Sequence, residues 1–141
     1  DAYFIRSGYA GKWQFKKDVP KIWNIEFGGL NLKISPTPFK HTGLFPEQLP
    51  NWQWTEKLIK EAKEKEQRDV SILNLFGYTG GATLAAAKAG AEVTHVDASK
   101  TAVAWARENA TPPDQRLRLE ATHSVGRWKW GMGWQGCRLA R

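Results

Sequence analysis

The amino-acid sequence predicts an α/β domain built on a parallel sheet, preceded by a small β-rich segment. Residues 70–76 form a short apolar run, which is typical of a buried strand, and a glycine-rich stretch follows at 77–81. A second short strand is predicted at 92–96. Helical patterns lie before, between and after these two strands. Such alternation favours a parallel sheet with right-handed crossovers.

The N-terminal segment, residues 1–54, is rich in aromatic residues, glycine and proline. Residues 22–27 alternate in part between apolar and polar side chains, and residues 30–34 alternate cleanly. Gly28 and Gly29 lie between the two runs. The pattern predicts a hairpin with a two-glycine turn, and the prolines that follow should end the pairing.

Residues 55–110 are predicted to contain three helices and two strands. Thr55 is expected to cap the first helix, which ends near residue 66 and presents Leu58, Ile59 and Ala62 on its apolar side. A helix of small residues is expected at 82–89 with Gly90 at its C-terminal end. Asp97 or Ser99 is expected to cap a last helix that runs to about residue 110.

The glycine-rich turn is the stretch that predicts chemistry. Ligands of open parallel sheets bind beyond the carboxyl ends of the strands, where glycine lets the backbone approach a ligand. Asp97 ends the second strand, and its carboxylate is suited to accept hydrogen bonds from ribose hydroxyls. A dinucleotide fingerprint requires a glycine two positions after Gly77, and Thr79 stands there. The spacing favours a site for S-adenosylmethionine and leaves a nucleotide- or NAD-binding oxidoreductase as the alternative.

Three segments together resemble a known family over roughly residues 10–110. They are Asn74-Leu75-Phe76-Gly77-Tyr78-Thr79-Gly80-Gly81, then Thr94-His95-Val96-Asp97-Ala98-Ser99-Lys100 with Trp105-Ala106-Arg107-Glu108-Asn109, and upstream Phe39-Lys40-His41-Thr42-Gly43-Leu44-Phe45-Pro46-Glu47-Gln48. The sequence resembles the class I S-adenosylmethionine-dependent methyltransferases that include bacterial ribosomal RNA cytosine carbon-5 methyltransferases. This resemblance implies a Rossmann-like fold, S-adenosyl-L-methionine as cofactor and RNA as partner and acceptor.

The resemblance also implies which residues hold the cofactor. Residues 76–81 would surround its methionine part and sulfonium, Asp97 would hold the ribose, and the segment 42–48 would fold over it. The implied contacts are Thr42, Phe45, Gln48, Phe76, Gly77, Tyr78, Thr79, Gly80, Gly81, Asp97, Ala98 and Ser99.

The acceptor half of the expected site has no match in the sequence. The family places an Asp-Pro-Pro segment after a fourth strand, whereas Thr111-Pro112-Pro113-Asp114 follows the glycine turn too closely and is interpreted as a helix stop. The tail, residues 111–141, is rich in Arg, Trp and Gly. We therefore expect a truncated or frame-shifted reading after about residue 110, with a divergent genuine tail as the alternative, and an inactive chain without assignable catalytic residues.

Charge and composition set further limits. The chain carries a net charge of +7, of which residues 111–141 contribute +4 (6 minus 2) and residues 1–110 contribute +3 (15 minus 12). A non-enzymatic RNA-binding module built on the tail therefore stays open. The histidines and Cys137 match no metal-binding spacing, so no metal is expected, and Cys137 lacks a nucleophile motif. A single cysteine and the lack of a long apolar run favour a cytoplasmic protein without a membrane span.

The unfinished sheet leads to one more expectation. Two parallel strands give a small core and leave an apolar edge unpaired. We expect marginal stability and self-association through that edge.

Overall fold

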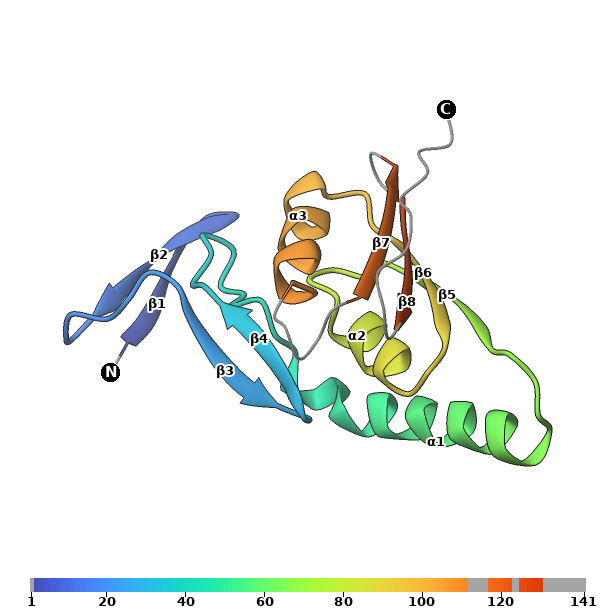
Figure 1. Cartoon of the computed structure of the whole chain (residues 1–141). Coiled ribbons are helices and arrows are strands. Elements are labelled where there is room, and N and C mark those ends of the chain that lie inside the picture. Colours follow the sequence, from blue (N-terminus) through green and yellow to red (C-terminus); the bar gives the residue numbers. More distant parts are fainter. Residues whose placement is uncertain (1, 112–116, 123–124, 131–141) are drawn as a thin grey trace.

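The computed structural model in Figure 1 describes residues 2–111, 117–122 and 125–130. Two antiparallel hairpins form the N-terminal part, and helices packed on a four-stranded sheet form the rest. The strands are β1 (Ala2–Ser7), β2 (Ala10–Phe15), β3 (Trp23–Phe27), β4 (Leu30–Ile34), β5 (Ser71–Leu75), β6 (Glu92–Val96), β7 (Leu117–Thr122) and β8 (Val125–Trp130). The helices are the 3-10 turn η1 (Pro46–Gln48), α1 (Leu49–Lys65), α2 (Gly81–Lys88) and α3 (Lys100–Asn109).

The hairpin predicted from the two alternating runs is confirmed as β3 and β4. Phe27 pairs with Leu30, so Gly28 and Gly29 form a two-residue turn. Their φ angles are +58° and +69°. A turn with two positive φ angles matches the twist of the strands that it joins and favours glycine at both positions. The apolar side chains of β4 are buried in the core, whereas those of β3 are half-buried.

A second hairpin, β1 with β2, was not predicted. Its strands pair along their whole length, from Ala2 opposite Phe15 to Ser7 opposite Ala10. Trp13 Nε1 donates to the Thr37 carbonyl over 2.8 Å, and Gly11 N donates to the Pro38 carbonyl over 3.2 Å. These bonds fasten the hairpin to the loop that follows β4.

The main sheet has the strand order β5-β6-β8-β7. β5 and β6 are parallel, as predicted. β8 is antiparallel to β6, and β7 is antiparallel to β8. A hairpin formed from the tail thus pairs with one side of the two parallel strands, whereas β5 remains an edge strand among the described strands, so an unpaired edge persists at β5. Leu117 and Leu119 lie in the edge strand β7.

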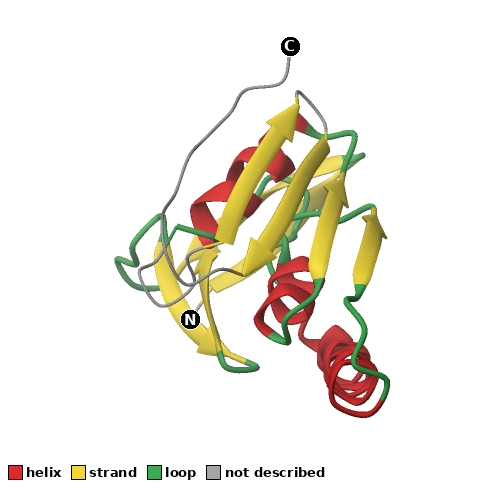
Figure 2. Cartoon of the chain, turned by 45° about the vertical axis from the view of Figure 1, so that its right-hand side comes forward, coloured by secondary structure: helices red, strands yellow, loops and turns green. Residues whose placement is uncertain are grey.

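The helices lie on one side of this sheet (Figure 2), and the core lies between them. Val93 of β6 and Leu84 of α2 are buried in it, together with Leu30 and Leu32 of β4. The prediction that the strand at 70–76 is buried on both faces is wrong. Leu73 and Leu75 are 61% and 55% exposed, because no described helix covers their face of the sheet.

The first helix begins earlier than predicted. α1 begins at Leu49 with a proline in its first turn, a position at which the missing amide hydrogen of proline costs nothing. Thr55 therefore lies inside the helix, where its hydroxyl donates to the Asn51 carbonyl. Ile59 and Ala62 are buried as predicted, but Leu58 is 44% exposed. The helix runs across residue 54, the predicted end of the N-terminal segment.

The elements around the glycine turn lie where the sequence placed them. α2 ends at Lys88, and Gly90 follows with φ +99°. α3 begins after Ser99, whose hydroxyl accepts the Ala102 amide hydrogen over 3.2 Å. The predicted glycine end and serine cap are both confirmed.

Candidate functional site

A cavity of about 490 Å³ lies beyond the carboxyl end of β5. It opens between two stretches that are distant in sequence: the covering segment, residues 42–48, and the glycine loop, residues 76–81. Its lining residues are Leu32, Gly43, Leu44, Phe45, Glu47, Gln48, Trp52, Asn74, Leu75, Phe76, Gly77, Tyr78, Thr79, Gly81 and Ala82. The volume lies within the range of small-molecule sites, and its place in the fold is where open α/β sheets bind ligands.

The covering segment and the glycine loop are joined directly. The Thr79 hydroxyl donates to the Gly43 carbonyl over 2.6 Å, and this bond is buried. The Phe45 and Tyr78 rings lie 5.2 Å apart between centroids, and His41 lies 5.3 Å from Phe45 on its other side. The contact between the Phe45 and Tyr78 rings therefore forms part of the cavity wall. His41 is exposed and lies outside the cavity lining.

The glycine loop has a strained backbone. Phe76 and Tyr78 have φ angles of +58° and +51°, which side chains beyond glycine rarely adopt. Gly80 has φ +92°, a conformation that requires glycine. Phe76 also leaves 87% of its surface exposed at the cavity. Backbone strain and exposed aromatic surface gather at ligand sites more often than elsewhere.

Two glycines of the loop are required by neighbouring rings. A Cβ at Gly77 would overlap the His95 imidazole, and a Cβ at Gly81 would overlap the Trp52 indole. The predicted reason for these glycines was approach to a ligand. The structure adds an internal reason, since both rings are buried against the loop.

A buried polar network supports the loop from beneath. The Asn74 side-chain amide donates to the Thr83 hydroxyl over 2.8 Å, and that hydroxyl lies 2.9 Å from His95 Nδ1. Burial lowers the pKa of His95. The Asp97 carboxylate raises this pKa, and the positive charge of Arg107 lowers it further. His95 is thus held neutral at pH 7. Asn74 brings this network to the cavity wall.

Asp97 holds the two strand ends together. One carboxylate oxygen accepts the Tyr78 amide hydrogen over 2.9 Å, and the other accepts that of Ser99 over 2.8 Å. Burial raises the pKa of Tyr78, and the negative charge of Asp97 also raises it. A hydrogen bond between Tyr78 and the Gly43 backbone acts in the opposite direction and lowers this pKa. Asp97, Ala98 and Ser99 lie beside the glycine loop but outside the cavity lining.

The remaining predicted contacts divide in two. Phe45, Gln48 and most of the glycine loop line the cavity, whereas Thr42 and Gly80 do not. Gly80 faces Ala106 of α3.

Several residues at the cavity were not predicted. Asn74, Glu47, Trp52 and Leu32 lie in its wall. The first three stand in or beside the recognised segments, which is a usable signal. Leu32 comes from β4, and only the folded structure brings it there.

Asn109 was part of a recognised segment but had no assigned role. Its amide group donates to the Thr79 carbonyl over 2.8 Å, and its carbonyl oxygen accepts the Lys33 amide hydrogen over 2.8 Å. It therefore ties α3 to both the glycine loop and β4.

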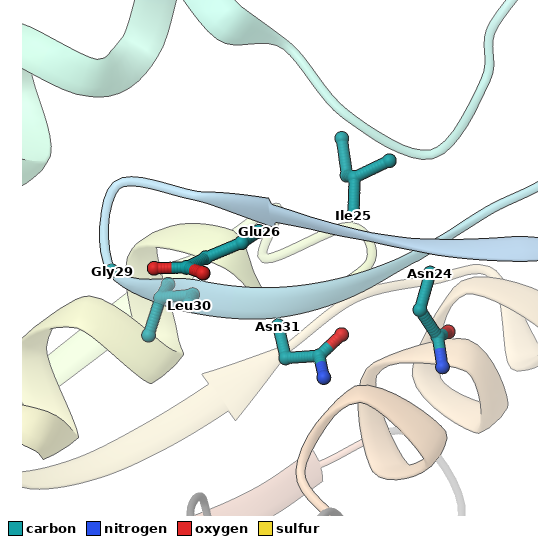
Figure 3. Close-up of a pocket in the computed structure, with 6 residues that line it drawn as sticks. All are labelled: Asn24, Ile25, Glu26, Gly29, Leu30 and Asn31. Atoms are coloured by element: carbon teal, nitrogen blue, oxygen red, sulfur yellow. The ribbon is translucent and has the colours of Figure 1, made fainter.

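A second cavity, of about 340 Å³, lies on the β3–β4 hairpin (Figure 3). Asn24, Ile25, Glu26, Gly29, Leu30 and Asn31 line it. All six come from one hairpin, and none of the recognised segments contributes. We therefore place the candidate site at the glycine loop.

No cluster of three or more potential metal ligands occurs within the described part of the chain. None of the helices described there combines the length and apolar character needed to cross a bilayer. Cys137 and His123 lie outside the described residues.

Comparison with known proteins supports the same region. No protein-family model matches the chain. A ribosomal RNA large subunit methyltransferase K/L from Pseudomonas paraeruginosa is 36% identical over 122 residues, covering 84% of this chain and 16% of that protein. The protein of the same name from Magnetococcus marinus is 39% identical over 82 residues, covering 57% of this chain and 10% of that protein. The chain thus spans a small part of the curated relatives it matches.

A solved structure agrees with the fold. The crystal structure of a SAM-dependent methyltransferase from Agrobacterium tumefaciens superposes with a TM-score of 0.75 at 43% identity. The match covers 82% of this chain and 36% of that one. The chain therefore has a Rossmann-like α/β fold, similar to that of a SAM-dependent methyltransferase of known structure.

Proposed function

We propose that the cavity between the covering segment and the glycine loop binds S-adenosyl-L-methionine. One observation carries the proposal: two segments that resemble a methyltransferase family form opposite walls of one cavity. They are joined by the hydrogen bond between Thr79 and Gly43, which are 36 positions apart in sequence. The similarity to SAM-dependent methyltransferases supports the same cofactor.

The residues fit the chemistry of this cofactor. S-adenosylmethionine supplies a methyl group activated by the positive charge of its sulfonium. The faces of Phe45, Tyr78 and Phe76 carry partial negative charge, which attracts a cation. Each Asp97 oxygen accepts one amide hydrogen and keeps a further lone pair for a ribose hydroxyl. Ala98 and Ser99 would lie near the adenine, and Thr42 and Gly80 would act through the loops that they shape.

The test is calorimetric titration of the chain with S-adenosylhomocysteine. Phe45→Ala removes one aromatic wall, and Phe39→Ala is the matched control, because Phe39 is 67% exposed and lies outside the cavity. We expect saturable binding that Phe45→Ala weakens by about tenfold, a stacking contact of ~1.4 kcal/mol, and that Phe39→Ala leaves unchanged. Asp97→Asn should weaken binding by ~1–3 kcal/mol, the loss expected for a charged hydrogen bond. Equal effects of the two phenylalanine variants would place the cofactor elsewhere.

We further propose that the whole protein methylates RNA. The names of the curated relatives support an RNA acceptor, and the resemblance to the carbon-5 branch makes cytosine the first base to test. None of the described residues is assigned to the acceptor side of the site. The proposal therefore includes that this chain is inactive and that its tail arose by truncation or frame shift. The proposed organisation keeps residues 1–54 as the N-terminal β-rich segment, 55–110 as the cofactor half and 111–141 as an atypical basic tail whose hairpin joins the main sheet.

Methyl transfer can be followed with labelled S-adenosylmethionine and large-subunit ribosomal RNA, using this chain and the full-length protein. Nucleoside analysis of the product identifies the atom. 5-Methylcytidine formed by the longer protein alone fits both proposals. Another methylated nucleoside would overturn the cytosine assignment, and transfer by this chain would overturn its proposed inactivity.

A further inference from the structure

The net positive charge of residues 2–110 comes from residues 2–17, which are the β1–β2 hairpin and the two lysines that follow it. Residues 2–17 contain Arg6, Lys12, Lys16 and Lys17 and no acidic residue. Residues 18–110 contain 11 basic and 11 acidic residues and have no net charge. The net positive charge of residues 2–110 therefore equals that of the β1–β2 hairpin with its two following lysines.

The same hairpin exposes apolar and aromatic side chains. Tyr3 lies opposite Gln14 and Ile5 lies opposite Lys12, so these four share one face of the hairpin. All four are exposed, and the Tyr3 hydroxyl bonds the Gln14 side chain. Tyr9, in the turn, is fully exposed. Figure 1 shows the hairpin standing away from the helices and the main sheet, where none of them covers it.

Exposed aromatic rings among cationic side chains match the chemistry of a single-stranded nucleic acid. Cations hold the phosphates, and rings stack on bases that have no neighbours of their own. A duplex presents already stacked bases and offers no such contact. A second copy of this hairpin would bring like charges together, so charge favours an anionic partner.

A continuous set of contacts leads from the hairpin to the cavity. β2 is bonded to the loop after β4 through Trp13 and Gly11, as described above. In that loop the Thr37 amide donates to the His41 carbonyl over 2.9 Å, and the Ser35 amide donates to the Thr42 carbonyl over 3.0 Å. The next residue, Gly43, receives the Thr79 hydroxyl of the glycine loop. The hairpin is thus held in a fixed relation to the covering segment.

We propose that the exposed surface of the β1–β2 hairpin binds single-stranded RNA and holds it beside the cofactor cavity. The proposal rests on the proposed function for its choice of RNA. The hairpin would bind phosphates through its cations and unpaired bases through Tyr3 and Tyr9.

The test measures binding of a fluorescent 12-nucleotide oligouridylate to the full chain by anisotropy, at several salt concentrations. The charge variant is Arg6→Gln with Lys12→Gln and Lys16→Gln, and its matched control is Lys57→Gln with Lys60→Gln and Lys65→Gln on α1. The ring variants are Tyr3→Ala and Tyr9→Ala, and their matched control is Trp54→Ala, which is 63% exposed on α1.

The expected result is specific to the hairpin. Removing three phosphate contacts should lower the slope of log K against log salt by about 2. Each tyrosine variant should weaken binding by about fivefold or more, the scale of one lost base stack. The α1 variants should change neither quantity, and a 12-base-pair RNA duplex should bind more weakly than the single strand.

Titration with S-adenosylhomocysteine in parallel separates the two proposals and shows that each variant is folded. Retained cofactor binding with RNA affinity that is equal in the hairpin and α1 variants would overturn the hairpin proposal alone. RNA binding lost in the hairpin variants while no variant binds the cofactor would support the hairpin and overturn the proposed function. The hairpin proposal would also be overturned if the wild-type chain binds no RNA and sedimentation shows that it dimerises through the hairpin.

Discussion

Residue 77 has no space for a side chain, because the His95 imidazole lies directly against its Cα. A glycine-rich loop is commonly attributed to ligand approach, yet here the ring beneath the loop already demands glycine. The Asn74 and Thr83 side chains hold that ring in turn. The position of the loop backbone therefore depends on two buried side chains, Thr83 and His95, and on the half-buried Asn74, which lines the cavity.

We expect Gly77→Ala to destabilise the fold by ~1–3 kcal/mol, since it overpacks a closed site. It should also weaken S-adenosylhomocysteine binding, because the loop must shift. Urea unfolding of Gly77→Ala, His95→Ala and the double variant measures the coupling between the two positions. The double variant should be more stable than the sum of the single effects predicts. Strict additivity would mean that the two side chains do not compete for one space.

The pH dependence of stability should report His95. Its pKa is lowered in the folded state, chiefly by burial, so the unfolded chain takes up a proton first as the pH falls. The stability is complete above the ordinary histidine pKa of about 6.5 and falls below it, by up to ~1.4 kcal/mol per pH unit. Urea midpoints between pH 7.5 and pH 5.5 measure this loss. His95→Gln should flatten the profile, and the exposed control His41→Gln should keep it.

At the scale of elements, α3 secures the glycine loop through its last residue. Asn109 is 1% exposed and bonds both the Thr79 carbonyl and the Lys33 amide. Asn109→Ala would leave a donor and an acceptor without that partner and should cost ~2 kcal/mol or more. Ser99→Ala, at the other end of the same helix, removes only a cap and should cost ~1 kcal/mol. Thermal unfolding compares them, and equal losses would show that Asn109 serves α3 alone.

Elements with local signals were predictable and elements defined by distant contacts were not. The β3–β4 hairpin follows from alternation around two glycines, and α3 follows from its serine cap. β1 lacks alternation, since Tyr3, Phe4 and Ile5 are consecutive. The predicted start of the first helix at Thr55 is too late, because α1 begins at Leu49 with a proline in its first turn. The pairing of β8 with β6 joins residues 29 to 37 positions apart, a contact that no local pattern predicts.

The site shows the same division. The glycine loop and covering segment were identified from their motifs, and the fold places both at one cavity. Leu32 has no motif and reaches the cavity only because β4 packs against α2 and α3. The hydrogen bond from the Tyr78 amide to Asp97 likewise depends on the parallel pairing of β5 with β6, whereas the bond from the Ser99 amide is local.

For the whole molecule, self-association depends on the sheet face that the helices leave open as well as on the edges of the sheet. β6 is paired with β8, but β5 remains an edge strand, so self-association through an unpaired edge stays a prediction. One face of β5 also stays open. Leu73 and Leu75 lie on it two residues apart, and the exposed ring of Phe76 follows. Large apolar side chains grouped in this way favour association.

We therefore expect the chain to self-associate through this face. Leu73→Ser with Leu75→Ser should shift sedimentation velocity profiles at micromolar concentration towards the monomer. These side chains are already more than half exposed, so the melting temperature should change little. Leu58→Ser is the matched control, because Leu58 is 44% exposed on α1, away from the open face. Association that both variants reduce equally would indicate general apolar attraction, and a monomeric parent chain would show that the open face of β5 is tolerated in water. A selective effect of the β5 variant would identify this face as the surface that the fold leaves to be covered.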